Sequence, residues 1–173
     1  YDPRDADTVW TLHEWAMRDA GTDPDDVPGT GDLRDVAGSY LDAGGDFLVG
    51  VMDDMGRGDR PPTTFDGAVV AMGGVLPNEA GHADERTVSG AGELHRVRVA
   101  PTHQRRGYGQ RLLAALEARA AALGLDPVLA TTAERQVGAV ALYRRAGYEA
   151  VDASREAGYD LVHFEKAVGD GEA

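Results

Sequence analysis

Apolar residues recur at helical spacing in four segments of the chain. In residues 5–20 the stripe consists of Val9, Leu12, Trp15 and Ala16, and it follows acidic residues that are typical of a helix start. The same spacing predicts helices at residues 32–43, 107–123 and 137–146, each of which ends beside a glycine.

Short apolar runs between these stripes predict strands, which are expected at residues 47–52, 68–76, 93–99, 127–132, 148–151 and 159–168. Short loops join the first three, so we expect antiparallel neighbours. The strand-helix-strand unit over residues 93–132 requires a parallel, right-handed crossover. The pattern therefore predicts an α/β fold with a mixed sheet, helices on its faces, one domain at 1–168 and a tail at 169–173.

Length and composition agree with a single globular domain. The chain has 173 residues and no cysteine, which excludes disulfides and thiolate nucleophiles. Apolar runs end near ten residues, as in 67–76, so no membrane helix is predicted. Because the polar first residues do not resemble a signal peptide, we expect a cytoplasmic protein. A chain that begins at Tyr1 is expected to have lost its natural beginning.

The charge is strongly acidic, with 30 acidic and 17 basic residues and a net charge of −13. Lys166 is the only lysine, and aspartate outnumbers glutamate by 20 to 10. This surface favours a halophilic protein that stays soluble in concentrated salt, and the alternative is a GC-rich genome. Nucleic-acid binding is not expected at this charge.

One segment departs from this acidity. Residues 94–116 hold five arginines and no acidic residue, so they carry +5 and leave −18 for the rest. A basic segment in an acidic chain suggests an anionic ligand. Chance clustering of exposed arginines is the alternative.

Four common site motifs are missing. The run Gly107-Tyr108-Gly109 begins like a dinucleotide fingerprint, but Leu112 stands where the third glycine belongs. The P-loop lysine and the Gly-x-Ser-x-Gly elbow are absent. The histidines do not occur at metal-ligand spacing, so we predict no metal site and regard them as surface or packing residues; they are His13, His82, His95, His103 and His163.

The most informative segment is the basic loop between the strand at 93–99 and the helix at 107–123. Backbone N–H groups at a helix start have no intrahelical partner, and glycines allow an anion to approach closely. Diphosphate suits such a turn, and an ordinary glycine-containing turn is the alternative.

Here the chain resembles the GNAT family of acyl-CoA N-acyltransferases. The family motif Arg/Gln-x-x-Gly-x-Gly/Ala is matched by Gln104, Gly107 and Gly109. A second motif, Asn-x-x-Ala…Leu-Tyr-x-x-x-Gly-Phe, is matched over residues 136–148, where Gln136 replaces asparagine and Tyr148 replaces phenylalanine. The resemblance covers about residues 47–168.

The resemblance implies a three-layer GNAT fold with a mostly antiparallel sheet, whose first strand would be missing from this sequence. It also implies acetyl-CoA as cosubstrate and no metal. Backbone groups of 97–99 would face the pantetheine, amides of 105–110 the diphosphate, and Gln136 the CoA arm. The cofactor-binding residues implied are Val97, Arg98, Val99, Gln104, Arg105, Arg106, Gly107, Tyr108, Gly109, Gln110 and Gln136.

Two catalytic residues follow from the resemblance. Glu93 matches the general base of the histone-acetyltransferase branch and would act through water, whereas other branches carry a glutamate where this chain has Thr131. Tyr143 matches the tyrosine that protonates the leaving thiolate. The alternatives are an ordinary strand-edge carboxylate for Glu93 and a packing tyrosine for Tyr143.

The predicted function is an N-acetyltransferase that moves acetyl from acetyl-CoA to a primary amine by direct attack in a ternary complex. One alternative is a non-catalytic acyl-CoA-binding sensor on the same fold, and another is a phosphate-binding regulatory module. The acceptor, a small-molecule or peptide amine, stays open. So does the oligomeric state, although homodimers are common in the family. No nucleic-acid or membrane partner is expected.

Overall fold

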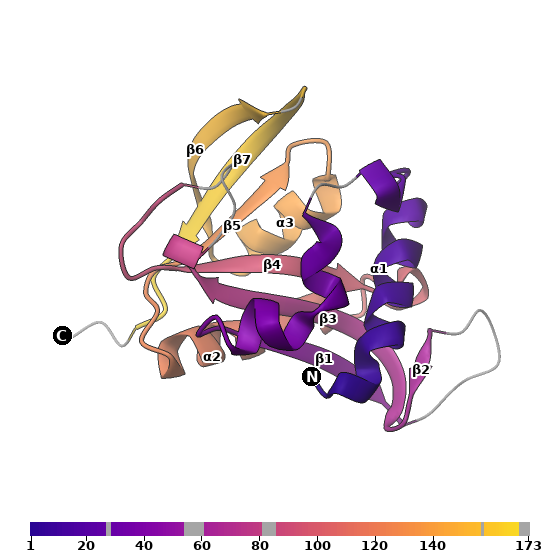
Figure 1. The fold of residues 1–173 in the computed structure, drawn as a ribbon. Coiled ribbons are helices and arrows are strands. Elements are labelled where there is room, and N and C mark those ends of the chain that lie inside the picture. The colour runs from indigo at the N-terminus through magenta and orange to yellow at the C-terminus, as the bar shows by residue number, and fades with distance from the viewer. Residues whose placement is uncertain (27–28, 54–60, 81–85, 157, 170–173) are drawn as a thin grey trace.

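A seven-stranded mixed sheet runs through the middle of the protein in a computed structural model (Figure 1). The structure describes residues 1–26, 29–53, 61–80, 86–156 and 158–169. The strand order is β1-β3-β4-β5-β7-β6, with β2 paired to β3. The strands are β1 Asp46–Met52, β2 Thr63–Thr64, β3 Gly67–Pro77, β4 Gly92–Val99, β5 Val128–Ala133, β6 Glu149–Glu156 and β7 Tyr159–Lys166.

The strand pairing confirms the predicted topology. β3 pairs antiparallel with β1 and β4, and β4 pairs parallel with β5 across the helical crossover. β7 then pairs antiparallel with both β5 and β6. A parallel neighbour requires a long connection, which the helix between β4 and β5 supplies.

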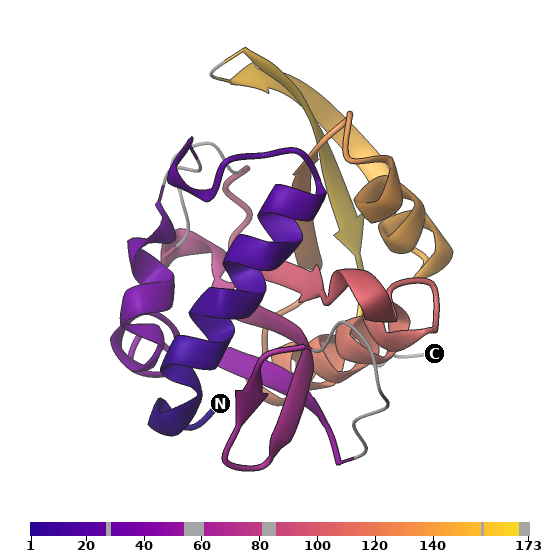
Figure 2. The same ribbon diagram turned by 90° about the vertical axis from the view of Figure 1, so that its right-hand side faces the viewer.

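Helices cover both faces of the sheet, giving three layers (Figures 1 and 2). Helix α1, Ala6–Asp19, lies on one face, and the helices α2, Tyr108–Ala122, and α3, Val137–Arg145, lie on the other. Each face has its own apolar cluster. Val9, Leu12, Tyr40 and Phe47 belong to the α1 side, and Leu94, Leu112, Leu116 and Tyr143 belong to the α2 side. Burial of these side chains stabilises the packing of the helices on each face of the sheet.

The helix predicted at 32–43 is wrong as one element. The structure has a 3-10 helix, η3 Thr30–Arg34, followed by a π-helix, η4 Ala37–Leu41. The break is at Asp35, whose φ of −139° and ψ of 68° are not helical. The Asp35 carboxylate accepts a hydrogen bond of 3.0 Å from the Gly38 amide, a local contact that competes with helix continuation.

The strand predicted at 148–151 is too short, since β6 continues to Glu156. Its side chains are mostly exposed and polar, so hydropathy carries little signal there. The backbone ladder with β7 extends the strand through Glu156, which pairs with Tyr159. The predicted connection at 53–65 likewise contains β2, and its residues 54–60 lie outside the described part.

Before α1 the described residues form a 3-10 turn, η1 Pro3–Asp5, and contain no strand. The amino group of Tyr1 donates a hydrogen bond of 3.1 Å to the Phe47 carbonyl of β1. None of the described helices is long and apolar enough to cross a membrane. Of the predicted tail, residues 170–173 lie outside the described part.

Candidate active site

The site begins where β4 and β5 part. The two strands pair only over residues 92–94 and 128–130. Beyond Leu94, β3 is the only described strand that pairs with β4. A bulge marks the point of separation, because the β3–β4 register shifts between Met72 and Gly74 and Arg96 adopts a φ of 53°. A bulge bends its strand and ends pairing locally. The β5-facing edge of β4 beyond His95 therefore has no strand partner within the described chain.

Two carbonyls on this stretch of β4 accept hydrogen bonds from side chains. The Arg98 guanidinium donates to the Val97 carbonyl at 2.9 Å, and the Gln104 amide donates to the Val99 carbonyl at 3.4 Å. A carbonyl oxygen has two lone pairs, so each can still accept a hydrogen bond from a ligand.

The helix α2 begins directly after this strand and its connecting loop. Gly107 is the N-cap with a φ of 86°, and no side chain in the described part of the chain caps the helix. The first amides of α2 are therefore available to an anion, at the positive end of the helix dipole. A Cβ atom on Gly107 would meet no atom of a described residue within 4 Å, whereas on Gly109 it would lie 3.2 Å from the Leu142 side chain. Gly107 thus serves the turn, and Gly109 allows α2 to pack close to α3.

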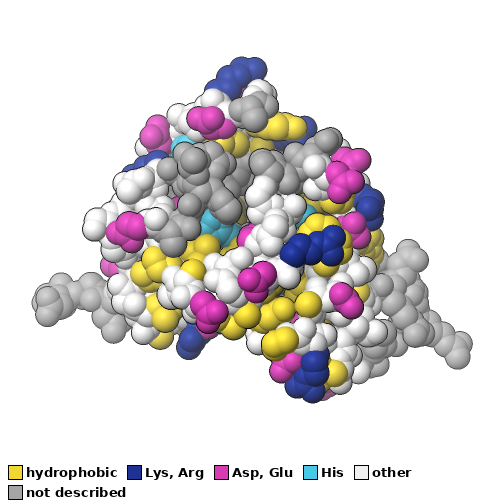
Figure 3. Space-filling model, in the orientation of Figure 1, with side chains coloured by type: hydrophobic (Ala, Val, Ile, Leu, Met, Phe, Trp, Pro, Cys, Tyr) yellow, Lys and Arg dark blue, Asp and Glu magenta, His cyan; other side chains and the backbone are white. Residues whose placement is uncertain are grey.

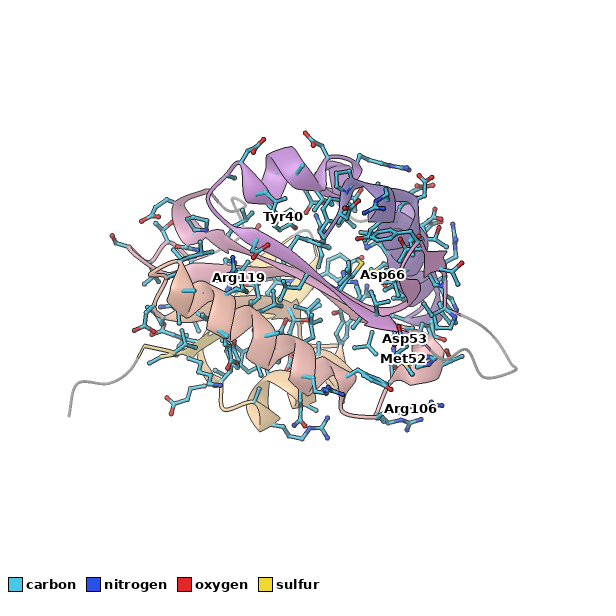
Figure 4. All side chains as sticks on the ribbon, turned by 90° about the horizontal axis from the view of Figure 1, so that it is seen from below. Tyr40, Met52, Asp53, Asp66, Arg106 and Arg119 are labelled. Carbon is cyan, nitrogen blue, oxygen red and sulfur yellow. The ribbon has the colours of Figure 1, made fainter. Side chains whose placement is uncertain are left out.

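The five arginines of the basic segment separate into two groups, so the segment is not one basic patch. Arg105, Arg106 and Arg111 are exposed around the start of α2, where Figure 4 shows Arg106 pointing away from the protein. Arg96 and Arg98 are largely buried on the sheet. Only the exposed group suits a diphosphate at α2.

Glu93 lies inside the sheet and not at its edge. Its β4 position is paired with Leu76 of β3 on one side and Leu129 of β5 on the other, and the residue is 1% exposed. The structure therefore excludes the strand-edge alternative. The Thr131 hydroxyl donates to Glu93 at 3.2 Å, and the Asn78 amide donates to its other carboxylate oxygen at 3.4 Å.

Tyr143 projects from α3 and is 5% exposed. Burial raises the pKa of its phenol to about 12, while Arg98 lowers the pKa and Glu93 raises it. The ring also packs on Tyr148 and Phe164, with centroids 5.5 and 5.4 Å away. The phenol thus stays protonated at neutral pH, as a proton donor must. The packing contacts of the alternative interpretation are present as well.

The comparisons with known proteins identify the family. The model of the acetyltransferase (GNAT) family matches residues 39–148, more than half of the chain. This chain belongs to the GNAT family. No curated protein matches it.

Solved structures agree with the GNAT fold. A GNAT-family acetyltransferase from Staphylococcus aureus Mu50 superposes with a TM-score of 0.70 at 14% identity, covering 95% of each chain. An aminoglycoside 6'-N-acetyltransferase complexed with coenzyme A gives 0.68 at 13% identity, covering 99% of this chain and 95% of that one. The ribosomal-protein-S18-alanine N-acetyltransferase from Escherichia coli gives 0.65 at 15%, covering 99% and 93%.

Sequence reasoning missed a buried polar cluster of this GNAT domain on the α1 side. The Asp32 carboxylate accepts from Arg96 at 2.9 Å and from the Tyr40 hydroxyl at 2.6 Å. Arg96 also donates to the Gly29 carbonyl at 2.8 Å. Burial and the Asp32 charge raise the Tyr40 pKa far above its ordinary value. No sequence spacing signals this cluster, because Asp32 and Arg96 are 64 positions apart.

Gln136 precedes α3, and its amide oxygen accepts from the Thr132 hydroxyl at 3.1 Å, which fixes the side chain near the turn after β5.

In the described part of the GNAT domain, no group of three His, Asp or Glu side chains could hold a metal. The face that carries α1 shows histidine side chains near its middle, with acidic and hydrophobic side chains interspersed (Figure 3).

Proposed function

We propose that this GNAT domain transfers an acetyl group from acetyl-CoA to a primary amine by direct attack in a ternary complex. The observation that carries the proposal concerns two neighbouring features: the β5-facing edge of β4 beyond His95 and the start of α2. Among the described residues, that edge has no strand partner and no side chain caps the helix. This arrangement supplies backbone donors for the acyl carbonyl and the diphosphate of one extended ligand. Family membership supports the acetyl group as cargo.

The residues at this edge fit acetyl-CoA. The space over Gly107 leaves room for phosphate oxygens at the amides of 105–110. The exposed Arg105, Arg106 and Arg111 add positive charge around that position. The pantetheine arm would then lie along 97–99, and its thioester would lie near Tyr143.

Glu93 and Tyr143 would carry the proton transfers. Because Glu93 is buried within the sheet, it would take the proton of the amine through a water molecule. The amine nitrogen then attacks the thioester carbon, and the carbon–sulfur bond breaks. The leaving thiolate takes the proton of the Tyr143 phenol, whose raised pKa keeps that proton in place until the thiolate forms.

An assay of acetyl-CoA with a panel of amines tests the proposal. The panel contains an aminoglycoside, a peptide with an N-terminal alanine, a lysine peptide, a polyamine and free amino acids. The first two follow the acceptors named for structural neighbours. Free CoA thiol is the readout, and a chain without cysteine adds no background. Thiol release with one acceptor supports the enzyme. If the protein binds acetyl-CoA but releases no CoA thiol with any amine of the panel, the acyl-CoA sensor is favoured. The cytoplasmic location and the homodimer stay predictions.

A further inference from the structure

Four polar side chains on four adjacent strands form a hydrogen-bonded chain that starts at Glu93. Thr131 of β5 is 3.2 Å from the Glu93 carboxylate, and its Oγ1 is 3.0 Å from Nδ1 of His163 on β7. Nε2 of His163 is 2.8 Å from the Ser154 hydroxyl of β6. The pairing of β5 with β7 creates the central link, since Thr131 lies directly opposite His163.

The proton inventory gives this chain a direction. The Thr131 hydroxyl has one proton, and it donates that proton to Glu93 when the carboxylate is ionised, as a general base must be. Its oxygen can then only accept from His163, so Nδ1 must carry a proton. In neutral histidine Nε2 is then an acceptor, and Ser154 donates to it. Every donor in the chain therefore points toward Glu93.

We infer that Thr131 and His163 are positioning residues that hold Glu93 as an oriented, ionised base. This inference rests on the proposed function. The imidazole keeps the Thr131 hydroxyl turned toward the carboxylate, and Ser154 keeps the imidazole in the tautomer that can do so. A hydrogen bond to the charged form of an acid favours that form. The hydrogen-bonded side chains therefore extend to lower pH the range in which Glu93 can accept a proton.

Burial makes the orientation strict. Glu93 is 1% exposed and His163 is 3% exposed, so bulk water cannot readily replace a lost partner. Among the described residues, the other groups that interact with the carboxylate include Asn78 from η5, Asn78–Ala80, and the Tyr143 and Tyr148 phenols. The far end opens to solvent, where Ser154 lines a surface hollow with the charged residues Glu134, Arg155 and Asp160.

The first experiment compares Thr131→Val with Thr131→Ser in the thiol-release assay, using one acceptor throughout. Valine removes the hydroxyl at nearly constant shape, and serine retains it. We expect the acidic limb of the kcat–pH profile to move up by about one pH unit in Thr131→Val and to stay in place in Thr131→Ser. Thr11→Val is the control, because this exposed hydroxyl on α1 bonds only to the Asp7 carbonyl among the described residues.

The second experiment separates the two ring nitrogens. An asparagine amide at position 163 can donate where Nδ1 lies, whereas a glutamine amide reaches the place of Nε2. We expect His163→Asn to keep the wild-type profile and His163→Gln to shift its acidic limb as Thr131→Val does. Melting temperatures of both variants check that this buried site still folds. Equal profiles for the asparagine and glutamine variants would overturn the inference.

The tautomer itself provides a readout that needs no activity. Long-range ¹H–¹⁵N NMR correlations of histidine-labelled protein, assigned with His163→Gln, should show a proton on Nδ1 of His163. A proton on Nε2 alone, or a Thr131→Val profile that matches wild type, overturns the inference. Failure of the proposed function looks different, because wild type would then release no thiol with any amine while the Nδ1 proton is still observed.

Discussion

Arg96 and Asp32 form an ion pair between a bulge in β4 and the helix η3, with 2.9 Å between Nε and Oδ2. Both side chains are only 10% exposed. Arg96 has a φ of 53°, which is rare for a residue with a Cβ atom. The ion pair connects the loop on the α1 face to the strand whose edge we assign to acetyl-CoA.

Breaking this pair should cost stability and loosen the cosubstrate site. Asp32→Asn removes the carboxylate charge that pairs with the buried Arg96 guanidinium, so we expect a loss of about 3 kcal/mol in the free energy of unfolding. Urea titration measures it. Asp160→Asn makes the same change at the exposed pair with Arg155, whose side chains are 61% and 71% exposed, and should cost less than about 1 kcal/mol. Similar losses at both positions would contradict the role of burial.

The turn before α2 can be tested with a matched pair of glycines. Gly107 and Gly124 lie at the two ends of α2, and both have a positive φ. A Cβ atom on either would meet nothing within 4 Å among the residues that the structure describes. Alanine should therefore impose similar backbone strain, of about 1 kcal/mol, at both. We expect only Gly107→Ala to reduce the melting-temperature shift that acetyl-CoA produces. Equal ligand-induced shifts in the two variants would rule out the diphosphate turn.

The roles of Glu93 and Tyr143 differ in their pH dependence. Glu93→Gln should lower turnover by roughly 10²-fold, and higher pH should partly restore it because more of the amine is already neutral. Tyr143→Phe should also lower turnover, but higher pH should not restore it, since the missing proton goes to the leaving group. Turnover against pH distinguishes the two profiles. Wild-type rates in both variants would remove both residues from the chemistry.

A buried histidine should make the fold sensitive to acid. Burial lowers the pKa of His13 to about 4 from an ordinary 6.5. Between these values the unfolded chain binds more protons than the folded one, so stability falls as pH falls through this window. The loss should approach about 3 kcal/mol by pH 4. We expect His13→Leu to reduce this slope in urea titrations at several pH values, and His103→Gln at a partly exposed histidine to retain it.

The net charge of −13 predicts the response to salt. Repulsion between carboxylates is screened as ionic strength rises, so the melting temperature should increase from low to molar KCl. A sodium chloride series distinguishes general screening from an effect of potassium. A melting temperature that is flat or falls would reject the halophilic interpretation.

Local patterns in the sequence predicted most helices and strands, including the strand-turn-helix unit with Gly107. These features depend on residues a few positions apart, so periodicity and glycine placement reveal them. The prediction for 32–43 was wrong because a single side chain, Asp35, interrupts the helix with a local hydrogen bond. The prediction for β6 ended too early because its polar exposed residues follow β7 and not a hydrophobic pattern.

By itself, the sequence determined the mixed sheet, the crossover between β4 and β5, and the glycine turn that suits a diphosphate; the acyl-CoA ligand followed from the family resemblance. Only the tertiary structure decided which side chains meet. It separated Arg96 and Arg98 from the exposed arginines, excluded the alternative of a strand-edge carboxylate for Glu93, and brought Thr131 and His163 to that residue. The reason is strand order and register, because residues that pair across β4, β5 and β7 are tens of positions apart and local periodicity does not encode their partners.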